Sequence, residues 1–87
     1  MLTEKEFLKL LGSQIARLRR SKGYSQDRLY LEGGFSRGTA SKIENGRVSS
    51  QIYTLYRIAE TIGVPLERLV SLESKNRVST PKKNLRA

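Results

Sequence analysis

The chain has 87 residues, with 17 Lys and Arg against 8 Asp and Glu, so its formal net charge is +9 at pH 7. It contains no cysteine and no histidine, which removes disulfide bonds and thiolate metal sites, together with the commonest metal ligand and the commonest general base. The length indicates a single domain, and the charge favours a polyanionic partner, either nucleic acid or an anionic membrane surface. We therefore expect that the protein is not an enzyme and that it binds no metal, no cofactor and no small-molecule ligand.

The N-terminus reads Met-Leu-Thr-Glu-Lys-Glu, with acids where a signal peptide is basic, and no apolar core follows. No uncharged apolar run approaches the ~20 residues of a membrane span. The sequence thus predicts a soluble cytoplasmic protein that does not enter a membrane.

The clearest predicted helix runs from Thr3 to Lys22. Thr3 and Glu6 fit a capping box, and Gly23 suits a left-handed residue after the last turn. Its apolar stripe follows steps of four and three residues: Phe7, Leu11, Ile15 and Leu18.

Two short helices follow. Ser25 is the expected N-cap of a helix over 26–33, and Ser36 caps a helix that runs to Asn45. Gly34 makes the tight turn between them. Apolar inner faces come from Leu29, Phe35 and Ile43, so the outer face of the later helix is free.

A fourth helix is predicted to begin near Ser49 or Ser50 and to end at Ile62. Its expected stripe is Ile52, Leu55, Ile58, Ala59 and Ile62. Pro65 suits the first position of a fifth, short helix, whose apolar residues are Leu66, Leu69 and Val70. Residues 74–87 hold five Lys and Arg and no acid, so 73–87 is expected to be a basic, disordered tail. The predicted fold over 1–72 is all-α, a compact five-helix bundle containing a helix-turn-helix.

The stretch from Leu11 to Val70 resembles the Cro/phage-repressor (Xre-type) helix-turn-helix domain, which has the lambda-repressor-like fold. The matching segments are LGSQIARLRRSKGYSQDRL, GGFSRGTASKIENG and LYRIAETIGVPLERL. The resemblance implies a bacterial, phage or plasmid transcription regulator, such as a repressor, that binds a palindromic double-stranded DNA operator as a homodimer. It also implies that the third helix lies in the major groove.

The resemblance carries roles to individual positions. The implied base-contacting residues are Arg37, Gly38, Thr39, Ser41 and Lys42. The implied phosphate contacts are Gln26, Ser36, Asn45 and Arg47. Arg19 and Glu44 match a pair that forms a buried ion pair in the family.

Three residues depart from the family pattern. Tyr30 stands where alanine is usual, and Ala40 stands where a branched residue is usual, so Tyr30 is expected to lean toward Ala40 and fill that space. Gly38 brings no side chain to a base-facing position, although it allows the backbone to approach closely.

One recognition helix reads only a few base pairs, so a symmetric dimer is expected. Its predicted interface lies on the C-terminal half, at Tyr53, Tyr56, Leu66 and Val70. Two alternatives stay open at this point. One is a protein-interaction module of the same fold, and the other is a basic protein that binds RNA or membrane surfaces without sequence preference.

Overall fold

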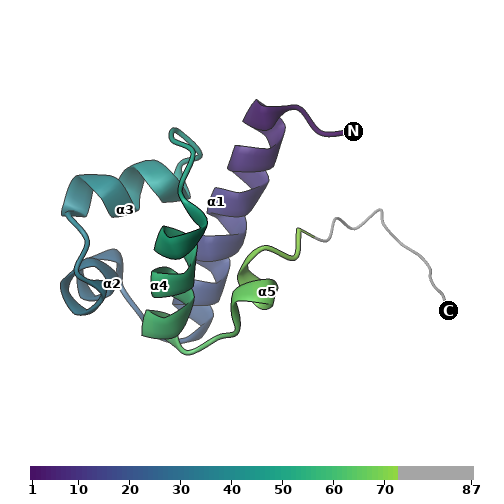
Figure 1. Ribbon diagram of the computed structural model, residues 1–87. Coiled ribbons are helices and arrows are strands. Elements are labelled where there is room, and N and C mark those ends of the chain that lie inside the picture. Colours follow the sequence, from purple (N-terminus) through teal and green to yellow (C-terminus); the bar gives the residue numbers. More distant parts are fainter. Residues whose placement is uncertain (73–87) are drawn as a thin grey trace, which may run out of the picture.

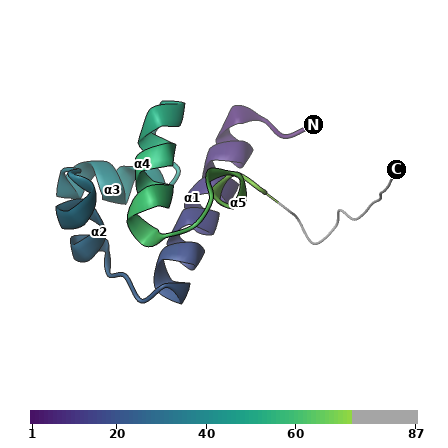
Figure 2. The ribbon, with the colours of Figure 1, turned by 60° about the horizontal axis from the view of Figure 1, so that its bottom comes forward.

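The structure, a computed structural model, describes residues 1–72. Its helices are α1 (Glu4–Ser21), α2 (Gln26–Gly33), α3 (Arg37–Glu44), α4 (Ile52–Ile62) and α5 (Leu66–Leu69). The described residues contain no strand, which confirms the predicted all-α class. In both views, α2 and α3 lie together at one end of the molecule, and α5 lies beside α1 at the other (Figures 1 and 2). The expected basic tail at 73–87 lies outside the described residues.

The helix ends follow the local sequence signals. The Thr3 side chain accepts a hydrogen bond from the backbone N–H of Glu6, and the Glu6 carboxylate accepts one from the N–H of Thr3, at 3.1 and 2.9 Å. Ser25 and Ser36 each accept a bond from the N–H three residues later, at 3.0 and 3.1 Å. These bonds satisfy N–H groups that a helix leaves without partners, so the chain fixes where three of its helices begin.

The core draws on every helix. The most deeply buried large side chains come from α1, α2, α4 and α5, one from each: Ile15, Leu29, Ile58 and Leu69. α3 adds Ala40 and Ile43, which are 3% and 5% exposed. Burying one aliphatic side chain of this size contributes about 1.5–3 kcal/mol. The short α2 and α3 are therefore held by the shared core rather than by their own helix propensity.

α4 begins later than predicted. Its first residue is Ile52 and its N-cap is Gln51, so neither Ser49 nor Ser50 caps it. The chain that leaves α3 passes against α1, because a Cβ on Gly46 would lie 2.9 Å from the Cα of Lys9. Residues 47–51 are then needed to carry the chain back to α4.

Three further details of the predicted elements are wrong. Ile52 and Phe7 fall on the apolar stripes predicted for their helices, but they do not join the core, since they are 63% and 41% exposed. Phe7 lies on the first turns of α1, which extend past the other helices (Figure 1), and Ile52 lies on the first turn of α4. Pro65 is the N-cap of α5 rather than its first residue, because its ψ of 148° is extended.

α1 and α3 approach so closely that only glycine fits between them. A Cβ on Gly12 would overlap the carbonyl oxygen of Glu44 and lie 2.7 Å from that of Ile43. Both atoms belong to the backbone, so neither can rotate away. The close contact therefore fixes where the C-terminal end of α3 lies on α1.

We expect Gly12→Ala to destabilise the fold by about 1–3 kcal/mol, because the added methyl group overpacks a backbone contact. Gly38→Ala is the matched control, since a Cβ at Gly38 meets nothing within 4 Å and alanine favours a helix by about 0.5–1 kcal/mol. Thermal unfolding should thus give opposite signs for the same substitution in two helices. A Gly12→Ala variant as stable as the wild type would contradict the close approach.

Candidate nucleic-acid interface

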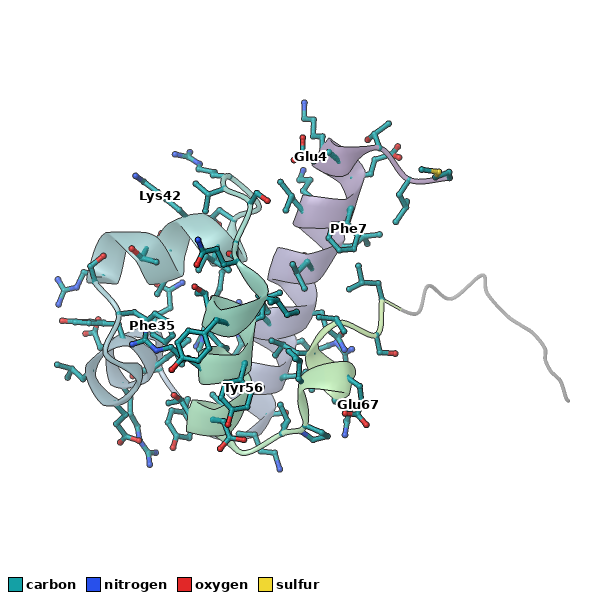
Figure 3. All side chains as sticks on the ribbon, viewed as in Figure 1. Glu4, Phe7, Phe35, Lys42, Tyr56 and Glu67 are labelled. Carbon is teal, nitrogen blue, oxygen red and sulfur yellow. The ribbon has the colours of Figure 1, made fainter. Side chains whose placement is uncertain are left out.

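The turn between α2 and α3 is built around two glycines and a phenylalanine. Gly34 has a φ of +75°, in the left-handed region that glycine adopts without strain. A Cβ on Gly33 would overlap the ring of Phe35, and Phe35 itself is buried. Phe35 lies where α2 and α3 meet, near α4 (Figure 3). The turn is therefore set by packing as well as by backbone conformation.

Arg57 of α4 clamps this turn. Its Nη2 donates hydrogen bonds to the carbonyl oxygens of Gly33 and Gly34, at 2.6 and 3.1 Å. Its guanidinium carbon lies 4.6 Å from the centre of the Phe35 ring, in a cation–π contact. These carbonyls belong to the end of α2, where a helix leaves C=O groups without partners. Arg57 could not be singled out from the sequence, because no periodicity or motif distinguishes it from a surface cation.

The opposite end of α3 is held by the expected ion pair. Arg19 Nε and Nη2 donate to Glu44 Oε2 and Oε1, at 2.7 and 2.9 Å. The two side chains are only 9% and 5% exposed. Arg19 Nη1 also donates to the Tyr24 carbonyl at 2.8 Å, and Gln26 Nε2 donates to Glu44 Oε1 at 3.0 Å. The cluster joins α1, the start of α2 and the end of α3.

With Glu44 buried, the charges that α3 leaves exposed are all positive. Arg37 and Lys42 are exposed on α3, and Arg47 is exposed just beyond it. Figure 3 shows Lys42 pointing away from the helical body. The remaining expected contact residues are small or polar and are exposed or half-buried: Ser36, Gly38, Thr39, Ser41 and Asn45. The structure thus brings this predicted set onto one surface.

Two side-chain hydrogen bonds already link members of this surface. The hydroxyls of Ser36 and Thr39 lie 2.7 Å apart, and Asn45 Nδ2 donates to Ser41 Oγ at 3.4 Å. Gln26 is half-buried and engaged with Glu44. Its expected phosphate contact stays a prediction.

Arg37 is tied to α2. Its Nη2 donates to the Tyr30 hydroxyl at 2.9 Å, and its Nε lies 3.6 Å from Asp27 Oδ1. The hydrogen bond to Tyr30 is the main cause that raises the pKa of Arg37 above its ordinary value, and the charge of Asp27 adds to it.

Tyr30 is half-buried and packs against the core, and Ala40 is buried. From the sequence, Tyr30 was expected only to fill space beside Ala40. The contact of its hydroxyl with Arg37 was not predicted, because Arg37 lies seven residues further along and across the turn.

The expected dimer surface is only partly free in the monomer. Tyr53 and Tyr56 are 63% and 45% exposed, and their rings stack with centres 5.9 Å apart. Figure 3 places Tyr56 on the near face of α4. Leu66 and Val70 are half-buried against the chain's own core, so they leave less surface for a partner.

Within residues 1–72, no helix is long and apolar enough to cross a bilayer. No group of three acidic side chains gathers to hold a metal ion in the same residues.

Fold and surface together define a helix-turn-helix domain. The model of the helix-turn-helix family HTH_3 matches residues 15–69, and the chain belongs to this family. The resemblance to Cro/phage-repressor (Xre-type) domains is thereby confirmed. Residues 15–69 are thus the DNA-binding helix-turn-helix domain of a transcriptional regulator.

Three known proteins illustrate the relationship. An uncharacterized HTH-type transcriptional regulator, y4dJ, from Sinorhizobium fredii is 43% identical over 63 residues, which cover 72% of this chain and 82% of the relative. The restriction-modification controller protein C.AhdI from Aeromonas hydrophila has a TM-score of 0.69 at 24% identity, over 71% of this chain and 94% of that one. An HTH_3 family transcriptional regulator from Vibrio cholerae has a TM-score of 0.73 at 29% identity, over 79% of this chain and 39% of that one. None of these relatives is named as an enzyme.

We expect Arg19→Met to destabilise the fold by about 3–5 kcal/mol, because it leaves the Glu44 carboxylate buried without compensation. Adding Glu44→Leu to the same chain should recover much of this loss. Arg28→Met is the control. It removes an ion pair with Glu32 in which both side chains are about half exposed, and such a pair contributes about 0–1 kcal/mol. Urea unfolding measures all three, and equal losses for Arg19→Met and Arg28→Met would contradict the buried role.

Proposed function

We propose that this protein regulates transcription by binding a two-fold symmetric DNA operator as a homodimer, with α3 of each protomer in the major groove. The observation that carries the proposal is the outer face of α3, which exposes cations and small polar groups while its one acid is buried with Arg19. Such a face can approach a groove lined by phosphates without repulsion.

Phosphate contacts then fix the register of the protein on the duplex. The start of α2, at Gln26, and the start of α3, at Ser36, are helix N-termini, which favour anions. Gln26 Nε2 carries a second N–H besides the one that it donates to Glu44, and the proposed phosphate contact uses it. Asn45 and Arg47 follow α3 and contact the DNA backbone at the point where the protein chain leaves the major groove.

The base contacts come from the residues that α3 exposes. Arg37 and Lys42 supply the long donors, and an arginine that pairs with O6 and N7 of guanine is the commonest specific contact in the major groove. Thr39 and Ser41 supply shorter polar groups. Gly38 lets the backbone approach the bases.

A dimer contacts a longer stretch of DNA than one helix can read. A two-fold axis sets the half-sites one turn apart, about 34 Å. Tyr53 and Tyr56 leave a stacked aromatic pair exposed, and tyrosine is enriched in protein interfaces. A surface around a two-fold axis is self-complementary, so the same tyrosines serve both protomers.

We expect Lys42→Ala to weaken binding to the preferred DNA by about 1–3 kcal/mol, because it removes a contact made inside the groove. The preferred DNA comes from selection by the full chain from a random pool, and fluorescence anisotropy measures the affinity. Lys22→Ala is the control, since Lys22 is an exposed lysine after the C-terminal end of α1 and is not among the residues assigned to DNA contacts.

Equal effects of the two substitutions would show that charge alone drives binding, as for a non-specific RNA- or membrane-binding protein. A chain that selects no DNA at all would instead favour the protein-interaction module. Either result would overturn the proposed function.

We expect Tyr53→Glu to lower dimer affinity and, through it, operator affinity, while the monomer stays folded. A charge in the middle of an apolar self-contact must be desolvated on association. Leu31→Glu is the control for association, because Leu31 is 70% exposed on α2, outside the expected interface. Sedimentation at micromolar concentration decides the matter. A strict monomer, with and without operator DNA, would refute the dimer.

A further inference from the structure

The guanidinium of Arg37 is contacted along one of its two donor edges. Its Nε lies 3.6 Å from Asp27 Oδ1 and its Nη2 donates to the Tyr30 hydroxyl at 2.9 Å. The guanidinium carbon also lies 5.3 Å from the centre of the Tyr30 ring. Asp27 and Tyr30 are three residues apart on α2, so they share one face of that helix.

This arrangement contributes little to stability. The Arg37 and Asp27 side chains are 69% and 66% exposed, and ion pairs at such exposure are screened by solvent. The fold is held elsewhere, by the core and by the buried pair of Arg19 and Glu44. The contacts do restrict the directions that a long, flexible side chain can take. A side chain that is already ordered loses less conformational entropy when it binds.

The geometry also selects which donors remain. Nε and one N–H of Nη2 form the side edge of the guanidinium, and both nitrogens contact residues of α2. Nη1 and the other N–H of Nη2 form the end edge, and within residues 1–72 Nη1 has no hydrogen-bond or ion-pair partner. Two parallel donors on one edge are what pairing with O6 and N7 of guanine requires.

We propose that Tyr30 is a positioning residue for DNA readout: its hydroxyl and ring hold Arg37 so that the end edge of the guanidinium is presented to one base pair. This inference rests on the proposed function and assigns part of its specificity to a residue on α2. Tyr30 contacts Arg37 and acts through it, so it need not touch a base. The chain combines a tyrosine on α2 with an arginine at the first position of α3, and this combination sets the preference at that base pair.

The test is a double-mutant cycle on Tyr30→Phe and Arg37→Ala in the full chain. Tyr30→Phe removes the hydroxyl and keeps the ring, so the core packing of Tyr30 is retained. The probe is the DNA selected by the wild type from a random pool, with substitutions at each position. The position that loses discrimination in Arg37→Ala is the base pair that Arg37 reads. At that position Tyr30→Phe should reduce discrimination by about three- to ten-fold, the scale of ordering one long side chain.

Two further readouts separate positioning from a general structural role. In the Arg37→Ala background, Tyr30→Phe should have no further effect on affinity or discrimination, because the side chain that it positions is absent. The salt dependence of Tyr30→Phe should match the wild type, since no phosphate contact is lost. Tyr24→Phe is the matched control. It removes the hydroxyl of a half-buried tyrosine, which donates to Glu32 Oε1 at 3.1 Å, and it should leave discrimination unchanged.

Unchanged discrimination in Tyr30→Phe, beside a clear loss in Arg37→Ala, would overturn the inference and leave the proposed function intact. An effect of Tyr30→Phe that persists in the Arg37→Ala background would also overturn it. A wild type that selects no preferred DNA would overturn the proposed function and this inference with it. Thermal unfolding of each variant shows that the comparison is made between folded proteins.

Discussion

The carboxylate of Glu44 lies at the C-terminal end of α3 with only 5% of its side chain exposed. Burial raises the free energy of a charged group there, and the negative end of the helix dipole raises that of a carboxylate further. Two hydrogen bonds from Arg19 and one from Gln26 compensate it. These donors come from α1 and α2, so the charge is satisfied only when three helices meet in one arrangement. The same contacts remove the negative charge of Glu44 from the outer face of α3.

The two ends of α3 are fixed by different arginines. Arg19 holds the C-terminal end, where Gly12 lets the α3 backbone press against α1. Arg57 holds the turn before the N-terminal end through the carbonyls of Gly33 and Gly34 and through the ring of Phe35. A helix of two turns has little stability of its own. Because both ends are fixed, the outer face of α3 stays exposed while the direction of the helix axis is held. A helix that contacts base edges requires both.

Sequence reasoning succeeded where the signal is local. The capping box at Thr3 and Glu6 and the left-handed turn at Gly34 depend on neighbours in the chain, so the residues alone predict them. Phe7 and Ile52 have the right periodicity, but they lie on first turns at the margin of the core, and periodicity carries no information about the length of a core.

The site shows the same division. The exposed face of α3 follows from the turn and the apolar inner positions, whereas Arg19 with Glu44 was expected only through the family resemblance. The contacts of Arg57 and of Tyr30 with Arg37 depend on how α2, α3 and α4 pack, and nothing in the spacing of these residues indicates it. The roles in DNA binding and dimerisation stay predictions.

Gly12 and Gly38 show why geometry is needed to interpret even a single residue type. Each lies within a helix, where glycine costs about 0.5–1 kcal/mol relative to alanine. At Gly12 the backbone of α3 occupies the space of a Cβ, so the fold itself requires glycine. At Gly38 the space is open and no described atom lies within 4 Å of a Cβ. The fold does not account for that glycine, whereas the close backbone approach in the proposed DNA complex does.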